Sequence, residues 1–135
     1  ILFCRPRIVD ITEQKVVLYI PLNRQTRNHV KSMYIGTMTV GADLVTGLTA
    51  MLSIRKSKHK IVLIFKDLNA TFLKRAEGDT FFTCNSVKEI ESAVGEVIAS
   101  NDRVNINVPV VATVPDKFGE EAVAEFTITL SMKEH

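Results

Sequence analysis

The sequence contains no tryptophan, few aromatic residues and only two cysteines, and each shortage excludes a class of protein. Aromatic residues make up 7% of the chain, which leaves little surface for stacking nucleic-acid bases. Seventeen Lys and Arg against 15 Asp and Glu give a net charge of +2, without the basic excess of a nucleic-acid-binding protein. Cys4 and Cys84 cannot form a disulfide framework, and we interpret them as buried thiols of a protein in the reducing cytoplasm.

Proline and glycine are also scarce, with four and six residues, which argues against a disordered or collagen-like chain. With 46% hydrophobic residues, the 135 residues are enough for one buried core, so we predict a single domain over residues 1–135. The start of the chain, which includes Arg5, lacks the pattern of a signal peptide. His29, His59 and His135 are not spaced as metal ligands, so we expect no metal.

One segment is almost free of charge. Between Ser32 and Ile54, Asp43 is the only ionisable carboxylate, and Lys, Arg and His are absent. The segment is long enough to cross a membrane, but it also contains three glycines, four threonines and two serines. A charge at the bilayer centre costs at least about 2.5 kcal/mol. We therefore predict a deeply buried core helix, which the basic run Arg55–Lys60 terminates, and no membrane span.

The remaining segments read as strands around that helix. Alternating apolar residues predict strands within residues 7–22, 61–73, 80–85, 104–114 and 122–132. Ser86 to Glu89 has the pattern of a capping box and predicts a second helix over 86–100. A turn at 115–119 joins the last two strands as a hairpin. The order is typical of an α+β domain in which an antiparallel sheet covers one apolar helix, whose Gly36, Gly41 and Gly47 suit close approaches.

Asp43 is the candidate catalytic residue of this helix. One interpretation is structural, with the carboxylate held by hydrogen bonds to backbone or a partner chain. The other is a general base or nucleophile facing a pocket. In that case the backbone N–H groups of Ile35 and Gly36, at the helix start, could stabilise an oxyanion. The polar loop before the helix brings further candidates there: Asn28, His29, Ser32 and Tyr34. A carboxylate with such donors suits the hydrolysis of an acyl compound.

Residues 28–37 followed by Asp43 resemble the helix-entry motif of hotdog-fold acyl-CoA thioesterases. In the phenylacetyl-CoA thioesterase branch, this motif reads Asn, a short spacer, Gly-Thr/Ser-x-His-Gly-Gly and then a helical Asp. Aligned without gaps, Asn28 matches the Asn, Gly36 the second glycine and Asp43 the catalytic carboxylate. Residues 67–80 are similar to the family strand that ends in a "YLRPARGGDTL" turn, and the terminal hairpin is similar too. The resemblance covers roughly residues 7–133.

The sequence departs from this branch at three places. Tyr34 stands where the family has its His, and Ile35 stands where the family has its first glycine. The predicted helix over 86–100 lies where the phenylacetyl branch continues a strand. In this respect the chain looks more like the less characterised bacterial hotdog proteins that are grouped with the thioesterases.

The resemblance implies a hotdog domain, with a curved sheet around a central helix and an additional short helix. It implies a homodimer or tetramer that hydrolyses an acyl-CoA or acyl-carrier thioester without metal or other cofactor, coenzyme A being part of the substrate. Asp43 of one subunit would activate water or attack the carbonyl, and Asn28 and the Ile35 or Gly36 amide of the other would hold the carbonyl. Further residues would line the pocket (Ser32, Tyr34 and His29) or contact the phosphates of coenzyme A (Lys74, Arg75 and Arg55).

Other interpretations compete with these roles. His29 could also be a solvated loop histidine, and the basic groups could be solvated faces. Cys84 and Ser53 lack the sequence context of a nucleophile. A non-catalytic hotdog module that binds an acyl chain or acyl-CoA is the alternative function. A hotdog dehydratase is disfavoured, because Tyr34 replaces the histidine that it would use.

Overall fold

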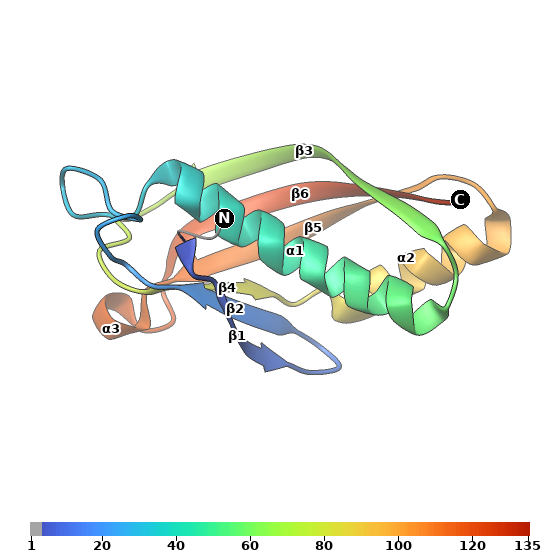
Figure 1. The fold of residues 1–135 in the computed structure, drawn as a ribbon, viewed down its shortest axis with the longest axis horizontal. Helices are drawn as coiled ribbons and strands as arrows, with labels where there is room; N and C mark the ends of the chain where they lie inside the picture. The colour runs from blue at the N-terminus through green and yellow to red at the C-terminus, as the bar shows by residue number, and fades with distance from the viewer. Residues whose placement is uncertain (1–3) are drawn as a thin grey trace.

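The chain forms a six-stranded antiparallel sheet that curves around one long helix (Figure 1). This computed structural model describes residues 4–135. Residues 1–3 lie outside the described residues. They belong to the predicted domain and to the N-terminal segment in which we found no signal-peptide pattern.

The order of elements confirms the predicted alternation of strand pairs and helices. Along the chain they are β1 (Arg7–Ile11), β2 (Val16–Ile20), α1 (Ile35–Ser57), β3 (Ile61–Phe72), β4 (Thr80–Cys84), α2 (Val87–Ser100), β5 (Val104–Thr113), α3 (Pro115–Phe118) and β6 (Ala122–Glu134). The strands lie in the order β1-β2-β4-β5-β6-β3, and β5 and β6 form the predicted hairpin. Its turn contains the short helix α3, which Pro115 begins and Gly119, with φ 58°, follows.

The helix α1 crosses the concave face of the sheet, where it contacts β2, β4 and β5 (Figure 1). By length and composition alone it could cross a membrane. Its packing against the sheet and α2 instead supports the predicted core helix. The helix begins three residues after the predicted start and ends at Ser57, because Lys58 adopts a left-handed φ of 63° and its N–H bonds to the Arg55 carbonyl.

The prediction that α1 is deeply buried is wrong for one side of the helix. Ile35 is 63% exposed, Met51 is also exposed, and Asp43 and Gly47 are half-buried. With Thr39, these residues are spaced four apart, so they form one stripe along the helix, which we call the open stripe. The sheet of one chain and α2 cover the other sides of α1 but leave this stripe uncovered.

The helix α2 lies beside α1 and contributes a second buried stripe. Ile90, Ala93, Val94 and Val97 are buried on it. The expected capping box is not formed, because the Ser86 side chain makes no hydrogen bond to the helix start. The C-terminus agrees with expectation, since Asn101 adopts a left-handed φ of 57°.

Within residues 4–135, the strand β3 is an edge strand that pairs with β6 only. Its apolar side chains Val62, Ile64 and Phe65 are all more than two-fifths exposed. The pairing with β6 shifts register between Phe65 and Asp67, which places a bulge at Lys66. One long edge therefore presents unpaired backbone groups and apolar side chains together, a combination that other chains readily cover.

A close approach between α1 and β4 explains one of the three helix glycines. A Cβ atom at Gly41 would overlap the ring of Phe82, which is fully buried. At Gly36 a Cβ atom would meet open space, and at Gly47 it would make only an ordinary contact.

We predict that Gly41→Ala lowers the free energy of unfolding by about 1 to 3 kcal/mol through overpacking against Phe82. The matched control is Gly95→Ala on α2, which meets no neighbouring atom and should raise it by about 0.5 to 1 kcal/mol. Urea denaturation measures both, and equal effects would contradict the close approach.

Candidate active site

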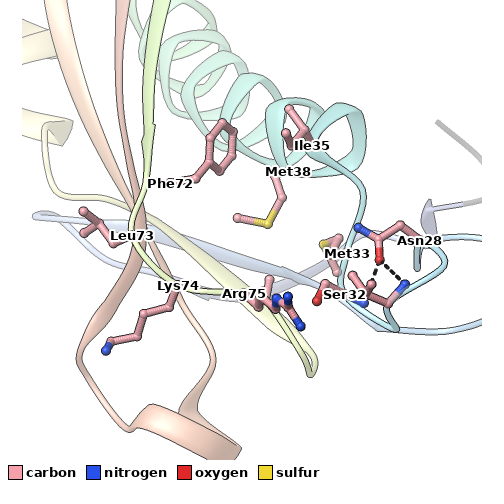
Figure 2. Close-up of a pocket in the computed structure, with 11 residues that line it drawn as sticks. Asn28, Ser32, Met33, Ile35, Met38, Phe72, Leu73, Lys74 and Arg75 are labelled. Carbon is pink, nitrogen blue, oxygen red and sulfur yellow. Dashed lines mark hydrogen bonds between the residues drawn. The ribbon is translucent and has the colours of Figure 1, made fainter.

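The loop before α1 is held in shape by Asn28. Its backbone N–H donates to the Ser32 carbonyl at 2.6 Å, and its Oδ1 accepts from the N–H groups of Val30 and Ser32 at 3.0 and 3.1 Å. Lys31 turns the chain with φ 61°. Because the carbonyl oxygen of the Asn28 side chain is used by the loop, its amide nitrogen is the part left for a ligand. Figure 2 shows this nitrogen on the side where Ile35 and Met38 lie.

Two backbone hydrogen bonds dock this loop onto the rest of the domain. The N–H of Met33 donates to the Ala76 carbonyl at 2.9 Å, and the N–H of Tyr34 donates to the Thr26 carbonyl at 2.8 Å. The first of these bonds brings the segment after β3 against the start of α1. The two segments that carry the resemblance, far apart in the sequence, therefore meet at one end of the sheet.

The first N–H groups of α1 are free to bind a ligand. Tyr34 is the N-cap residue and provides no side-chain cap. The earliest helical bond is the one from the Met38 N–H to the Tyr34 carbonyl, at 2.9 Å. Among the described residues, the N–H groups of Ile35 and Gly36 have no hydrogen-bond partner. Such donors at a helix start favour a carbonyl or an anion.

A cavity of about 390 Å³ lies beside this helix start (Figure 2). Its floor consists of buried residues, namely Ser32, Met33, Met38 and Ala76. Its rim consists of half-buried or exposed ones, namely Asn28, Val30, Ile35, Phe72, Leu73, Lys74 and Arg75. The cavity is thus mostly apolar and has hydrogen-bond donors and cations at its rim, a composition typical of small-molecule sites.

Five of the predicted site residues line this cavity and five do not. Those lining it are Asn28, Ser32, Ile35, Lys74 and Arg75; those outside it are Gly36, Tyr34, His29, Arg55 and Asp43. Arg55 lies in the last turn of α1, twenty residues after Ile35, or about 30 Å along the axis. The functional roles of all ten remain predictions.

The two cations at the rim differ in their contacts. Lys74 points away from the cavity in Figure 2, pairs with Glu121 at 2.8 Å and lies over the ring of Phe118. Arg75 forms no ion pair within the described residues, and in Figure 2 it lies toward Ser32 and Met33. Arg75 is therefore the rim cation that is available to a phosphate.

Asp43 lies in a separate cavity of about 280 Å³, between α1 and β3. Thr39, Lys66 and Asp67 line the same cavity. No described residue forms a hydrogen bond or ion pair with the Asp43 carboxylate, and partial burial raises its pKa above the usual range. Asp43 follows Ile35 by eight residues, or about 12 Å along the helix axis. Within one chain, the carboxylate and the helix-start donors therefore cannot act on the same atom.

The sequence did not point to the apolar lining of the first cavity. Met38, one turn after Ile35, and Phe72, at the end of β3, both line it (Figure 2). Helix and strand periodicity assigns such residues to the core, so no local signal marked them as part of a cavity.

The two cysteines are free and buried as expected. Burial raises the pKa of the Cys84 thiol, which is unfavourable for a nucleophile. Among residues 4–135, no three His, Cys, Asp or Glu side chains are grouped as metal ligands.

The family described as "Domain of unknown function (DUF4442)" matches residues 3–132. The chain belongs to the DUF4442 family. No curated protein matches the DUF4442 chain.

Solved structures show that the DUF4442 chain has the hotdog fold. A Chlorobaculum tepidum protein of unknown function is similar with a TM-score of 0.85 at 11% identity, over 99% of this chain and 85% of its own. A Pseudomonas aeruginosa protein described as a probable thioesterase has a TM-score of 0.82 at 21% identity, over 98% and 85%. A thioesterase from Haemophilus influenzae has a TM-score of 0.71 at 9% identity, over 98% and 81%. The predicted hotdog architecture, with its additional helix α2, is confirmed.

The raised pKa of Asp43 predicts an unusual dependence of stability on pH in the DUF4442 chain. The folded state binds a proton more tightly than the unfolded state does, so stability falls as pH rises from the unfolded pKa through the higher folded pKa. Asp43→Asn has no such charge. We predict that it is more stable than wild type at neutral pH, and that the difference disappears below the unfolded pKa.

Denaturation at several pH values measures this difference. Asp67→Asn is the matched control, because the Asp67 carboxylate accepts a hydrogen bond from Thr129 at 2.6 Å. A lower stability of Asp43→Asn at neutral pH would show instead that the carboxylate is held by a partner group.

Proposed function

We propose that this chain is a thioesterase that hydrolyses acyl-CoA or acyl-carrier thioesters at the interface of a homodimer. The observation that carries the proposal is the arrangement along α1. The free N–H groups of Ile35 and Gly36 lie beside an apolar cavity, and eight residues after Ile35, on the same open stripe, lies a carboxylate that has no partner among the described residues. The similarity in fold to proteins named as thioesterases supports the same reaction.

A second copy of the chain would bring the separated groups together. If two α1 helices lie antiparallel across a two-fold axis near Thr39, residue 35 of one faces residue 43 of the other. The open stripe suits such a contact, because it carries the exposed apolar residues Ile35 and Met51 and the small residue Gly47. The free edge of β3, with exposed Val62 and Ile64, would then extend the sheet into the partner.

The proposed reaction uses backbone donors and one carboxylate. The N–H groups of Ile35 and Gly36 and the amide nitrogen of Asn28 would polarise the thioester carbonyl and stabilise the oxyanion. The partner's Asp43 would take a proton from water, whose oxygen attacks the carbonyl carbon. Collapse of the intermediate breaks the C–S bond, and the proton passes to the leaving thiolate. Direct attack by the carboxylate is the other route open to Asp43, with water then hydrolysing the anhydride.

The remaining residues would serve binding. Arg75 would contact a phosphate of coenzyme A at the rim, whereas Lys74 would first have to leave Glu121. The reaction needs no cofactor besides the coenzyme A of the substrate. The free thiols Cys4 and Cys84 are compatible with the proposed cytoplasmic location.

One observation favours the alternative, a non-catalytic module that binds an acyl chain. The side-chain oxygen of Asn28 closes the loop, so Asn28 has a structural role without any reaction. In that case the cavity would bind acyl-CoA and release it unchanged. A measurement of acyl-CoA hydrolysis distinguishes the two functions, because only the thioesterase releases free thiol.

We predict that Asp43→Asn lowers kcat for acyl-CoA hydrolysis about 100- to 10,000-fold, because it removes the base. Wild-type kcat should rise with pH as Asp43 loses its proton, at a pH above the usual range for aspartate. Release of free thiol from a panel of acyl-CoAs measures both. Asp67→Asn is the control, since Asp67 lines the same cavity but is bonded to Thr129, and it should retain wild-type turnover. Unchanged hydrolysis by Asp43→Asn would refute its role, and no turnover by wild type would favour the binding module.

The shared site predicts that two inactive variants restore each other. Asn28→Ala and Asp43→Asn, unfolded together and refolded as a mixture, should recover about a quarter of wild-type activity. The reason is that about half of the dimers are mixed, and each of these has one intact site of two. Each variant refolded alone is the control. A different tag on each variant verifies that mixed dimers have formed. If these mixed dimers are inactive, Asn28 and Asp43 do not form one site across the dimer interface.

A further inference from the structure

Ser32 has a hydroxyl group that the protein leaves without a partner. The residue is 4% exposed, and its Oγ is the one buried side-chain nitrogen or oxygen atom of residues 4–135 that forms no hydrogen bond. Its backbone N–H and carbonyl are both bonded to Asn28, which fixes the residue in place. A buried hydroxyl without a partner is unfavourable, and native structures rarely leave one unsatisfied. This atom therefore points to a partner that a ligand supplies.

The position of Ser32 indicates which part of a ligand reaches it. Ser32 lies on the cavity floor, where the other residues are Met33, Met38 and Ala76, so its hydroxyl is the only polar side-chain group there. The polar and charged side chains of the same cavity, Asn28, Lys74 and Arg75, lie at the rim. A coenzyme A arm carries phosphates and would stay at the rim beside solvent. The group that enters deeply enough to meet Ser32 is the acyl group.

We propose that Ser32 determines the specificity of this site, by forming a hydrogen bond to an oxygen atom of the acyl group. The preferred substrates are then thioesters whose acyl chain carries a hydroxyl or oxo oxygen, rather than plain hydrocarbon chains. This inference rests on the proposed thioester hydrolysis and adds a substrate class to it.

The expected discrimination follows from the cost of an unpaired group. Ser32 Oγ is already buried without a partner among the described residues, and a plain acyl chain that fills the cavity would leave it so, whereas an oxygen atom of the acyl group would supply the missing hydrogen bond. A site with a buried polar group rejects such an analogue far more strongly than an apolar pocket rejects an extra methylene. Met33 and Met38 can adjust their shape around the chain, so the hydroxyl is the discriminating element of the floor.

The test compares hexanoyl-CoA with 3-hydroxyhexanoyl-CoA, which differ by one oxygen atom. Wild type should hydrolyse the hydroxylated thioester with a kcat/KM at least about tenfold higher. In Ser32→Ala this preference should fall to about threefold or less, with most of the change in KM. Equal rates in wild type, or a preference that survives in Ser32→Ala, would overturn the inference. An equal loss for both thioesters would also overturn it, because the hydroxyl would then bind the shared coenzyme A portion.

Thermal stability distinguishes this role from a structural one. Without ligand, Ser32→Ala should melt at the same temperature as wild type or higher, because no hydrogen bond is lost and an unsatisfied group is removed. Ser131→Ala is the matched control. Ser131 is equally buried, but its Oγ accepts a hydrogen bond from Arg103 at 2.9 Å. It should melt lower and keep the wild-type preference. A clear decrease in the melting temperature of Ser32→Ala would assign the hydroxyl to the fold.

A binding measurement keeps this inference separate from the proposed function. The increase in melting temperature on adding each thioester is recorded with Asp43→Asn, and with the double variant that also carries Ser32→Ala. A larger increase with the hydroxylated thioester, present in the single variant and absent from the double one, supports the inference even if no thioester is hydrolysed. Equal increases overturn it, even if hydrolysis is established.

Discussion

The helix α1 carries apolar side chains on all sides, and the rest of the structure depends on covering them. Such a helix is stable only when most of its surface is removed from water. The curved sheet and α2 cover part of it so closely that Phe82 fills the space a side chain at Gly41 would need. Ile35 and Met51 remain exposed along the open stripe. A Cβ atom at Gly47 of this stripe would lie 3.4 Å from the ring of Phe65 on the edge strand β3. The uncovered side of α1 and the unpaired edge of the sheet therefore lie next to each other.

This constraint also sets the chemistry of Asp43. A carboxylate on an otherwise apolar stripe loses hydration without gaining a partner, and its pKa rises. A second copy that covered the stripe would remove further water and raise the pKa again. A carboxylate with a raised pKa is a stronger base, provided that it is ionised at the working pH. The covering that stabilises the helix is therefore the same change that would prepare its one carboxylate for catalysis.

The sequence predicted the fold better than the site. Strand alternation and the low charge of α1 are local patterns, so the succession of strands along the chain and both long helices could be predicted from them. The capping box at Ser86 failed because the pattern does not determine whether the side chain turns to the helix. The pairing of Lys74 with Glu121, the edge position of β3 and the meeting of Phe72 and Met38 at one cavity depend on contacts distant in sequence. The distance of Asp43 from Ile35 along the axis follows from helix rise, but only the structure shows that Asp43 and Asn28 line different cavities.

The contribution of the backbone to the site explains how the sequence can depart from the thioesterase motif at Tyr34 and Ile35. The donors at the start of α1 are main-chain N–H groups, which any non-proline residue supplies, and the side-chain oxygen of Asn28 keeps them in position through the loop. Substitutions at the rim therefore leave these N–H donors intact and change what surrounds them. The floor is different, because Met33, Met38 and the hydroxyl of Ser32 act through their side chains. The substrate preference proposed for this chain therefore depends on the floor rather than on the helix start.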